Sequence, residues 1–122
     1  MIFDGRTPCQ SFAAEHQMNV SPTCFKLKWR LILNRDPITH EATTYTIRKV
    51  VDNLPHDVSG NWTIIRGIRE NPKAIIYKLD PDDAKNSISL LVGDENVIFF
   101  LNKRNGLYTG NSDFGFTLNK KK

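Results

Sequence analysis

The sequence lacks any apolar run long enough to cross a membrane as a helix. The longest run, Val97 to Leu101, has about five residues, whereas a helical membrane span needs about 20. The first residues also lack the charged start and apolar core of a secretory signal peptide. The chain opens on Ile2 and Phe3, which we interpret as part of a strand. We therefore interpret the chain as trimmed, and the missing signal does not indicate the cytoplasm.

Catalytic signatures are missing as well. The three histidines, His16, His40 and His56, lie outside any known nucleophile, zinc or phosphate-loop motif. The acidic segment Asp80–Asp83 lacks the spacing of a calcium-binding loop, so we expect a solvated turn there. These absences predict a protein that is not an enzyme. A cleft that brought His40 or His56 to a carboxylate would instead indicate catalysis.

Charge of one sign is in small excess. The chain has 17 lysines and arginines against 13 aspartates and glutamates, a formal net charge of +4. Three of the cations form the terminal run Lys120, Lys121 and Lys122, which we expect to be a flexible, solvated tail. The rest of the chain is close to neutral and has no basic stripe with stacking aromatic residues. We therefore do not predict a nucleic-acid partner.

What the sequence does contain is a repeated period-2 pattern. In the segment Phe25–Leu33, apolar residues alternate with Lys26, Lys28 and Arg30, which is typical of a strand with one buried face. Turn-forming residues separate this run from others like it. The predicted strands cover Met1–Asp4, Phe25–Leu33, Thr43–Val51, Trp62–Arg66, Ala74–Leu79, Ile88–Val92, Val97–Asn102 and Phe114–Leu118.

Short turns join most of these strands, which favours a single all-β domain over residues 1–122. We predict an antiparallel meander closed into a barrel of about eight strands; a β-sandwich is the competing architecture. Asn53, Pro55 and Gly60 mark the turn region expected before the fourth strand. The long first connection, Gly5 to Thr23, is the exception, and we expect a helical turn in it at Ser11–Gln17.

An eight-stranded barrel can be filled by side chains or can hold one small ligand. The simpler interpretation of the inward aromatic residues is core filling, and an apolar ligand cavity is the alternative. Ile98 and Phe100 alternate with the inward set and, with Ile32, predict an outer apolar patch. The residues predicted to face the interior are Trp29, Trp62, Tyr77, Phe99, Phe114 and Phe116.

The segment from Cys9 to Cys24 carries the most distinctive chemistry. A disulfide between the two cysteines would fix the long connection to the barrel. Two unpaired thiols are a second interpretation. A copper site formed by Cys9, His16, Met18 and Cys24 is a third, because thiolate, imidazole and thioether are ligands that suit copper(I). The spacing matches no compact metal motif, so all three stay open.

Five segments of the chain resemble the NlpE-type lipoproteins of the bacterial envelope. The resemblance implies a lipocalin-like meander barrel, an exported location, and a role in copper homeostasis or envelope-stress sensing. The better-known members of the family carry a Pro-Cys-x-x-Cys sequence near the first strand, whereas here Pro8-Cys9 is followed by a second cysteine at position 24. The resembling segments are Gly5–Cys9, Cys24–Leu31, Gly60–Ile64, Ala74–Leu79 and Gly110–Leu118.

We therefore predict a non-enzymatic domain of the bacterial envelope, in the periplasm or on an outer-membrane lipoprotein. It would act in copper homeostasis or stress sensing through contacts with envelope proteins, with copper as its candidate cofactor. Membrane association would require a lipid anchor outside this chain. The alternative function is a lipocalin-like module that binds a small apolar ligand inside the barrel. The sequence predicts no oligomeric state.

Overall fold

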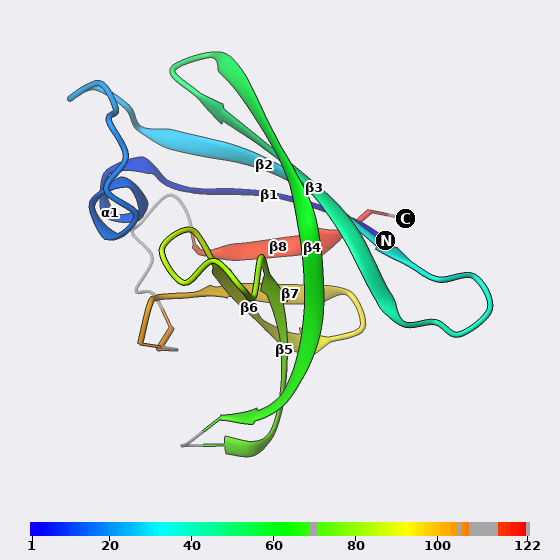
Figure 1. Cartoon of the computed structure of the whole chain (residues 1–122). Helices are drawn as coiled ribbons and strands as arrows, with labels where there is room; N and C mark the ends of the chain where they lie inside the picture. The colour runs from blue at the N-terminus through cyan, green and yellow to red at the C-terminus, as the bar shows by residue number, and fades with distance from the viewer. Residues whose placement is uncertain (69–70, 105, 108–114, 122) are drawn as a thin grey trace.

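The computed structural model describes residues 1–68, 71–104, 106–107 and 115–121, and its strands form a closed antiparallel barrel. The strands follow one another around the barrel in chain order, and β8 closes on β1 (Figure 1). The predicted all-β meander barrel is confirmed. The elements are β1 (Ile2–Pro8), α1 (Cys9–Glu15), β2 (Lys26–Arg35), β3 (Ala42–Val51), β4 (Leu54–Ile68), β5 (Asn71–Leu79), β6 (Ile88–Asp94), β7 (Val97–Leu101) and β8 (Thr117–Lys120).

Strand β2 shows how alternation in the sequence becomes a barrel wall. Leu27 and Leu31 are fully buried on its inner face, while Lys28 and Arg30 are exposed on its outer face. Arg30 donates to Asp4 on the neighbouring strand β1 at 2.8 Å. Both partners of this ion pair are solvent-exposed, so the pair adds little to stability, and burial of the leucines stabilises the strand much more.

The middle of the barrel is filled with side chains. Apolar residues from six of the eight strands meet there and are at most 2% exposed, which leaves no room for a ligand between them. Core filling is therefore the correct interpretation for this part of the interior. The residues that fill it include Phe3, Leu27, Leu31, Leu33, Leu79, Leu90, Ile98, Phe100 and Leu118.

Of the predicted inward aromatic residues, Trp29, Trp62 and Phe116 are buried in the core. Tyr77 is half-buried and packs its ring edge-on against Trp62, with ring centroids 5.1 Å apart. Phe114 lies outside the described residues.

The prediction for β7 is wrong, because its two faces are exchanged. Ile98 and Phe100 point inward and are 1% and 0% exposed, whereas Phe99 is on the outer face. Phe100 pairs with the buried Leu90 of β6, and the ring of Phe99 lies against Gly93. Every residue of β7 is apolar, so alternation gives no indication of which face is buried. The outer patch predicted from Ile98 and Phe100 therefore does not exist.

Strand β4 is much longer than the predicted Trp62–Arg66. Its first half, residues 54–61, pairs with β3, and β5 joins only from Trp62 onward. Pro55 and Gly60 lie inside this strand instead of in a turn. The first half of β4 pairs with β3 along one edge, where Pro55 lies opposite Val50, and its other edge is unpaired in the described part of the chain. Such an edge strand tolerates a proline, which has no N–H to donate. The turn itself is Asp52–Asn53, with φ of 49° and 65°, the left-handed geometry of a two-residue hairpin.

The barrel closes through a short seam between β1 and β8. Phe3 pairs with Lys120 and Asp4 with Asn119, and among the described residues the ladder consists of these two pairs. Lys120 thus ends β8 instead of belonging to a tail, and the Lys121 amide donates to the Ile2 carbonyl at 2.8 Å; Lys122 lies outside the described residues.

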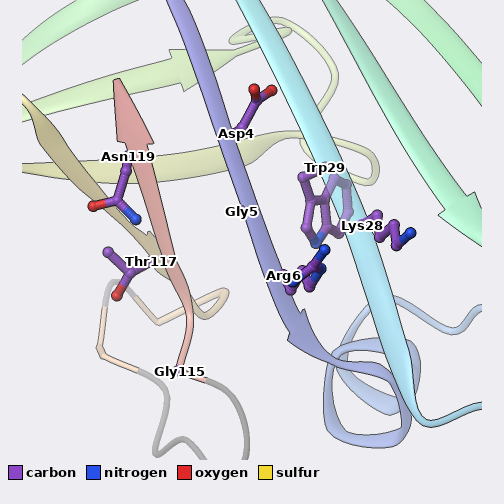
Figure 2. A pocket seen from close by; sticks show the side chains of 8 residues that line it. All are labelled: Asp4, Gly5, Arg6, Lys28, Trp29, Gly115, Thr117 and Asn119. Carbon is purple, nitrogen blue, oxygen red and sulfur yellow. The ribbon is translucent and has the colours of Figure 1, made fainter. Parts of the chain in front are cut away.

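Gly5 permits the close approach of the two strands at this seam. A Cβ at position 5 would collide with the carbonyl oxygen of Thr117 and the side chain of Leu118. Figure 2 shows the shallow outer groove beside the seam, between β1 and β2 on one side and β8 on the other. Gly115, Thr117 and Asn119 line the groove from the β8 side.

Candidate functional site

Helix α1 covers one end of the barrel, where the β3–β4 hairpin and the β5–β6 connection also lie (Figure 1). A disulfide between Cys9 and Cys24 joins the start of the helix to the chain just before β2, with the two Cα atoms 5.8 Å apart. At the other end of the helix, Glu15 Oε1 accepts from the Lys103 amide at 2.9 Å. The predicted disulfide is confirmed, and the helix begins two residues earlier than expected. The described residues include no helix long and apolar enough to span a bilayer.

Phe12 is the residue through which α1 enters the barrel. Its ring is 1% exposed and meets Trp29 and Phe100 edge-on, with ring centroids at 4.9 and 5.3 Å. Such edge-to-face pairs stabilise a core beyond the apolar area they bury. The helix is therefore a plug, anchored in the core by Phe12. The disulfide, the Glu15 carboxylate and the Gln10 side chain, which donates to the Cys24 carbonyl at 3.0 Å, tie it to the chain around it.

The plug does not fill the whole mouth, and a cavity of about 380 Å³ remains beside it. Such a volume lies near the lower end of the ~300–1,000 Å³ typical of small-molecule sites. The cavity is walled by α1, by the inner faces of β3 and β4, and by the β5–β6 connection. Its lining consists of Phe12, His16, Met18, Trp29, Tyr45, Ile47, Lys49, His56, Val58, Asp80, Asp83, Lys85, Asn86 and Ile88.

The floor of the cavity is apolar and its rim is polar. Trp29 and Ile47 are buried in the barrel core beneath it. The indole N–H of Trp29 donates to the Thr7 hydroxyl at 2.9 Å, so the polar atom of the ring is satisfied and its apolar faces remain for packing. Val58 extends the apolar wall along the projecting β3–β4 hairpin, where its side chain is 50% exposed.

Tyr45 and Asp80 close one side of the cavity. The phenol of Tyr45 donates to Asp80 Oδ2, and the Asp80 amide donates to the Asn61 carbonyl at 2.8 Å. Burial and the Asp80 carboxylate raise the pKa of the Tyr45 hydroxyl above its usual value of 10.0, so it stays protonated and acts as a donor. Asp80 was expected in a solvated turn, but the structure places it half-buried in this wall.

Lys49 lies on the inner face of β3, between Trp29 and His56 on the neighbouring strands. Its ammonium group donates to the thioether sulfur of Met18 at 3.6 Å. Burial lowers the pKa of this lysine below its usual value. A half-buried cation in contact with a thioether is unusual, because ammonium groups are strongly hydrated and thioethers are weak acceptors.

His16 occupies the rim next to the plug and stacks on Phe12, with ring centroids 4.2 Å apart. Burial lowers the pKa of this imidazole to about 4, and the positive charges of Lys103 and Lys49 act in the same direction, against Glu15. The side chain is therefore neutral at pH 7.

This shift predicts that His16 makes the fold less stable in acid. The unfolded chain takes up the proton at a pKa of 6.5 and the folded chain only at about 4, so the stabilisation is complete above pH 6.5 and is lost as the pH falls through this window. We expect the wild type to lose about 1–2 kcal/mol more than the variant His16→Gln between about pH 7.5 and pH 4.5, allowing for solvent screening. Urea unfolding at the two pH values measures the difference.

The control is His40→Asn, which removes an exposed histidine from the β2–β3 turn. His40 has a φ of 63°, and asparagine tolerates that conformation. The free energy of unfolding of His40→Asn should change between the two pH values by the same amount as that of the wild type. If the free energy of unfolding of His16→Gln changed with pH as much as that of the wild type, His16 would not contribute to the loss of stability in acid.

The four residues predicted to bind copper do not form such a site. Cys9 and Cys24 are bonded to each other in the disulfide, so neither sulfur is available as a thiolate ligand. His16 and Met18 do line the same cavity. In the described part of the chain, no cluster of three or more His, Cys, Asp or Glu side chains has the geometry to hold a metal ion.

His40 and His56 make no hydrogen bond to a carboxylate among the described residues. His56 lines the same cavity as Asp80 and Asp83, the arrangement that would indicate catalysis. The hydrogen bonds of these carboxylates, however, come from Tyr45 and from Asn86.

Sequence reasoning missed most of this site, although one signal was available. Lys49 stands at every second position with the inward residues Tyr45, Ile47 and Val51, so the period-2 pattern places it on the same face, inside the barrel. Comparisons of the chain with family models, with curated proteins and with solved structures found no match. Membership of the NlpE-type family remains a prediction.

Proposed function

We propose that this domain is a non-enzymatic binding module that holds a small, largely apolar molecule at the mouth of its barrel. The observation that carries the proposal is the cavity of about 380 Å³ beside the plug helix, with an apolar floor and a polar rim. Concave sites that combine apolar walls with a few polar groups are the usual form of small-molecule sites. The filled centre of the barrel limits the ligand to this end of the molecule.

The disulfide supports an oxidising compartment for the domain, since such bonds are rare in cytosolic proteins. The envelope location implied by the NlpE resemblance agrees with this and stays a proposal, as does a role in stress sensing through envelope proteins. A role of the two cysteines in binding copper(I) is not proposed, because both sulfurs are bonded to each other.

Titration with the neutral fluorophore N-phenyl-1-naphthylamine tests the binding proposal. Its emission rises when it leaves water, and the cavity-lining Trp29 provides a second signal through energy transfer. We expect one site with a Kd of about 1–100 µM, the range set by typical binding energy per ligand atom.

A pair of variants locates the bound probe. Val58→Trp puts an indole on the inner face of the hairpin and should weaken binding at least about tenfold. Ser59→Trp places the same ring on the outer face and should change the Kd less than about twofold. Absence of wild-type binding, or an equal effect of both variants, would overturn the proposal.

A further inference from the structure

Lys49 lies on the inner face of the barrel, at its mouth, where the fold does not require a charged residue. Lys49 follows Ile47 and precedes Val51 on the inner face of β3, and both of these neighbours are buried. It lies in register with Trp29, whose side chain is part of the cavity floor. An apolar residue would continue the pattern of this face, so a cation here needs another reason.

The described residues provide no anionic partner for this cation. Lys49 makes no ion pair among them, and its hydrogen bond goes to the Met18 sulfur at 3.6 Å. The ammonium group has three N–H donors. Burial lowers the pKa of its ammonium group, as expected for a cation without a neighbouring carboxylate.

The two carboxylates of the cavity are already engaged by donors of the protein. Asp80 Oδ2 accepts from the Tyr45 phenol. Asp83 accepts from Asn86 through both of its oxygens, at 3.3 Å from the backbone amide and 3.0 Å from the side-chain amide. A cationic ligand would have to compete with these bonds, whereas an anionic ligand would meet a lysine without a carboxylate.

We infer that the ligand of this cavity is an amphipathic organic anion, with its carboxylate, sulfonate or sulfate group on Lys49 and its apolar body against Trp29 and Ile47. The inference rests on the proposed function, because it specifies the class of molecule bound at the same site. An anion that accepts from Lys49 replaces the thioether contact with a charge-assisted hydrogen bond, which is shorter and stronger. His16 is neutral at pH 7, and Lys49, in register with Trp29, is the cation beside the apolar floor of the cavity.

The experiment compares two probes that share one apolar body. 1-Anilinonaphthalene-8-sulfonate and N-phenyl-1-naphthylamine differ only in the sulfonate group. The variant Lys49→Met removes the ammonium group and keeps a chain of similar length. We expect it to weaken binding of the sulfonate probe at least about tenfold and to change binding of the neutral probe less than about twofold.

The matched control is Lys28→Met, which removes the same charge from the outer face of β2, where the side chain is exposed. It should leave the Kd of both probes within about twofold of the wild type. If the neutral probe binds and Lys49→Met weakens both probes equally, or neither, the inference fails while the proposed function stands. If neither probe binds the wild type, both fail.

A competition assay on the wild type keeps the inference testable should Lys49→Met fail to fold. Decanoate and 1-decanol have the same ten-carbon body, and without a cation the neutral alcohol would bind better, because a carboxylate loses more hydration on burial. We expect decanoate to displace N-phenyl-1-naphthylamine at a lower concentration than 1-decanol does. The opposite order would overturn the inference.

Discussion

Replacing Phe12 by alanine should lower the free energy of unfolding by about 3–5 kcal/mol, the range for deleting a buried phenyl ring. The ring is 1% exposed and is the main contact of α1 with the barrel core, through Trp29 and Phe100. The helix has seven residues, too few to be stable without tertiary contacts. Loss of the ring therefore removes the packing that holds the helix in place. Urea unfolding followed by the fluorescence of Trp29 and Trp62 measures the loss.

Phe25→Ala provides the matched control for that measurement. It deletes the same side chain from a position that is 60% exposed, directly before β2. Substitutions at exposed positions usually change stability by less than about 1 kcal/mol. Equal destabilisation of the two variants would show that the loss of stability does not depend on insertion of the ring into the barrel.

The fold could be predicted wherever charged and apolar residues alternate. β2 has lysines and arginine on every second position, which specifies both the strand and its buried face. β7 has no polar residue at all, so the strand was predicted correctly and its orientation was not. In β4, Pro55 and Gly60 indicated a turn, but a strand with one unpaired edge tolerates both. Local turn propensity was overridden by tertiary pairing with β3.

The candidate site was harder to predict because it combines elements that are distant in sequence. The cavity brings together α1, the β3–β4 hairpin and the β5–β6 connection. Lys49 could have been placed inside by alternation alone. The burial of Phe12 could not, because a seven-residue helix provides fewer than two full turns of periodicity. Asp80 lies in a segment with the composition of a solvated turn, and only the folded chain brings Tyr45 beside it.

Breaking the disulfide should cost about 3 kcal/mol, the value that the chain-entropy model assigns to a closed loop of about 15 residues. Cys9 and Cys24 are separated by 15 residues along the chain, and the loop they close contains the whole of α1 except its first residue. In the unfolded chain this bond keeps residue 9 next to residue 24, which lowers the conformational entropy that folding has to remove. The double variant Cys9→Ala/Cys24→Ala removes the bond, and alanine places no unsatisfied hydroxyl at the two buried positions.

Urea unfolding of four samples separates this effect from other consequences of reduction. The wild type should lose stability when dithiothreitol is added, and the double variant should resemble the reduced wild type whether or not the reductant is present. Alkylation of the unfolded wild type followed by mass measurement should label two cysteines only after reduction. Two labelled cysteines without reductant would show that the bond does not form in the purified protein. An unfolding midpoint that reduction leaves unchanged would show that the plug is held by Phe12 and Glu15 rather than by the disulfide.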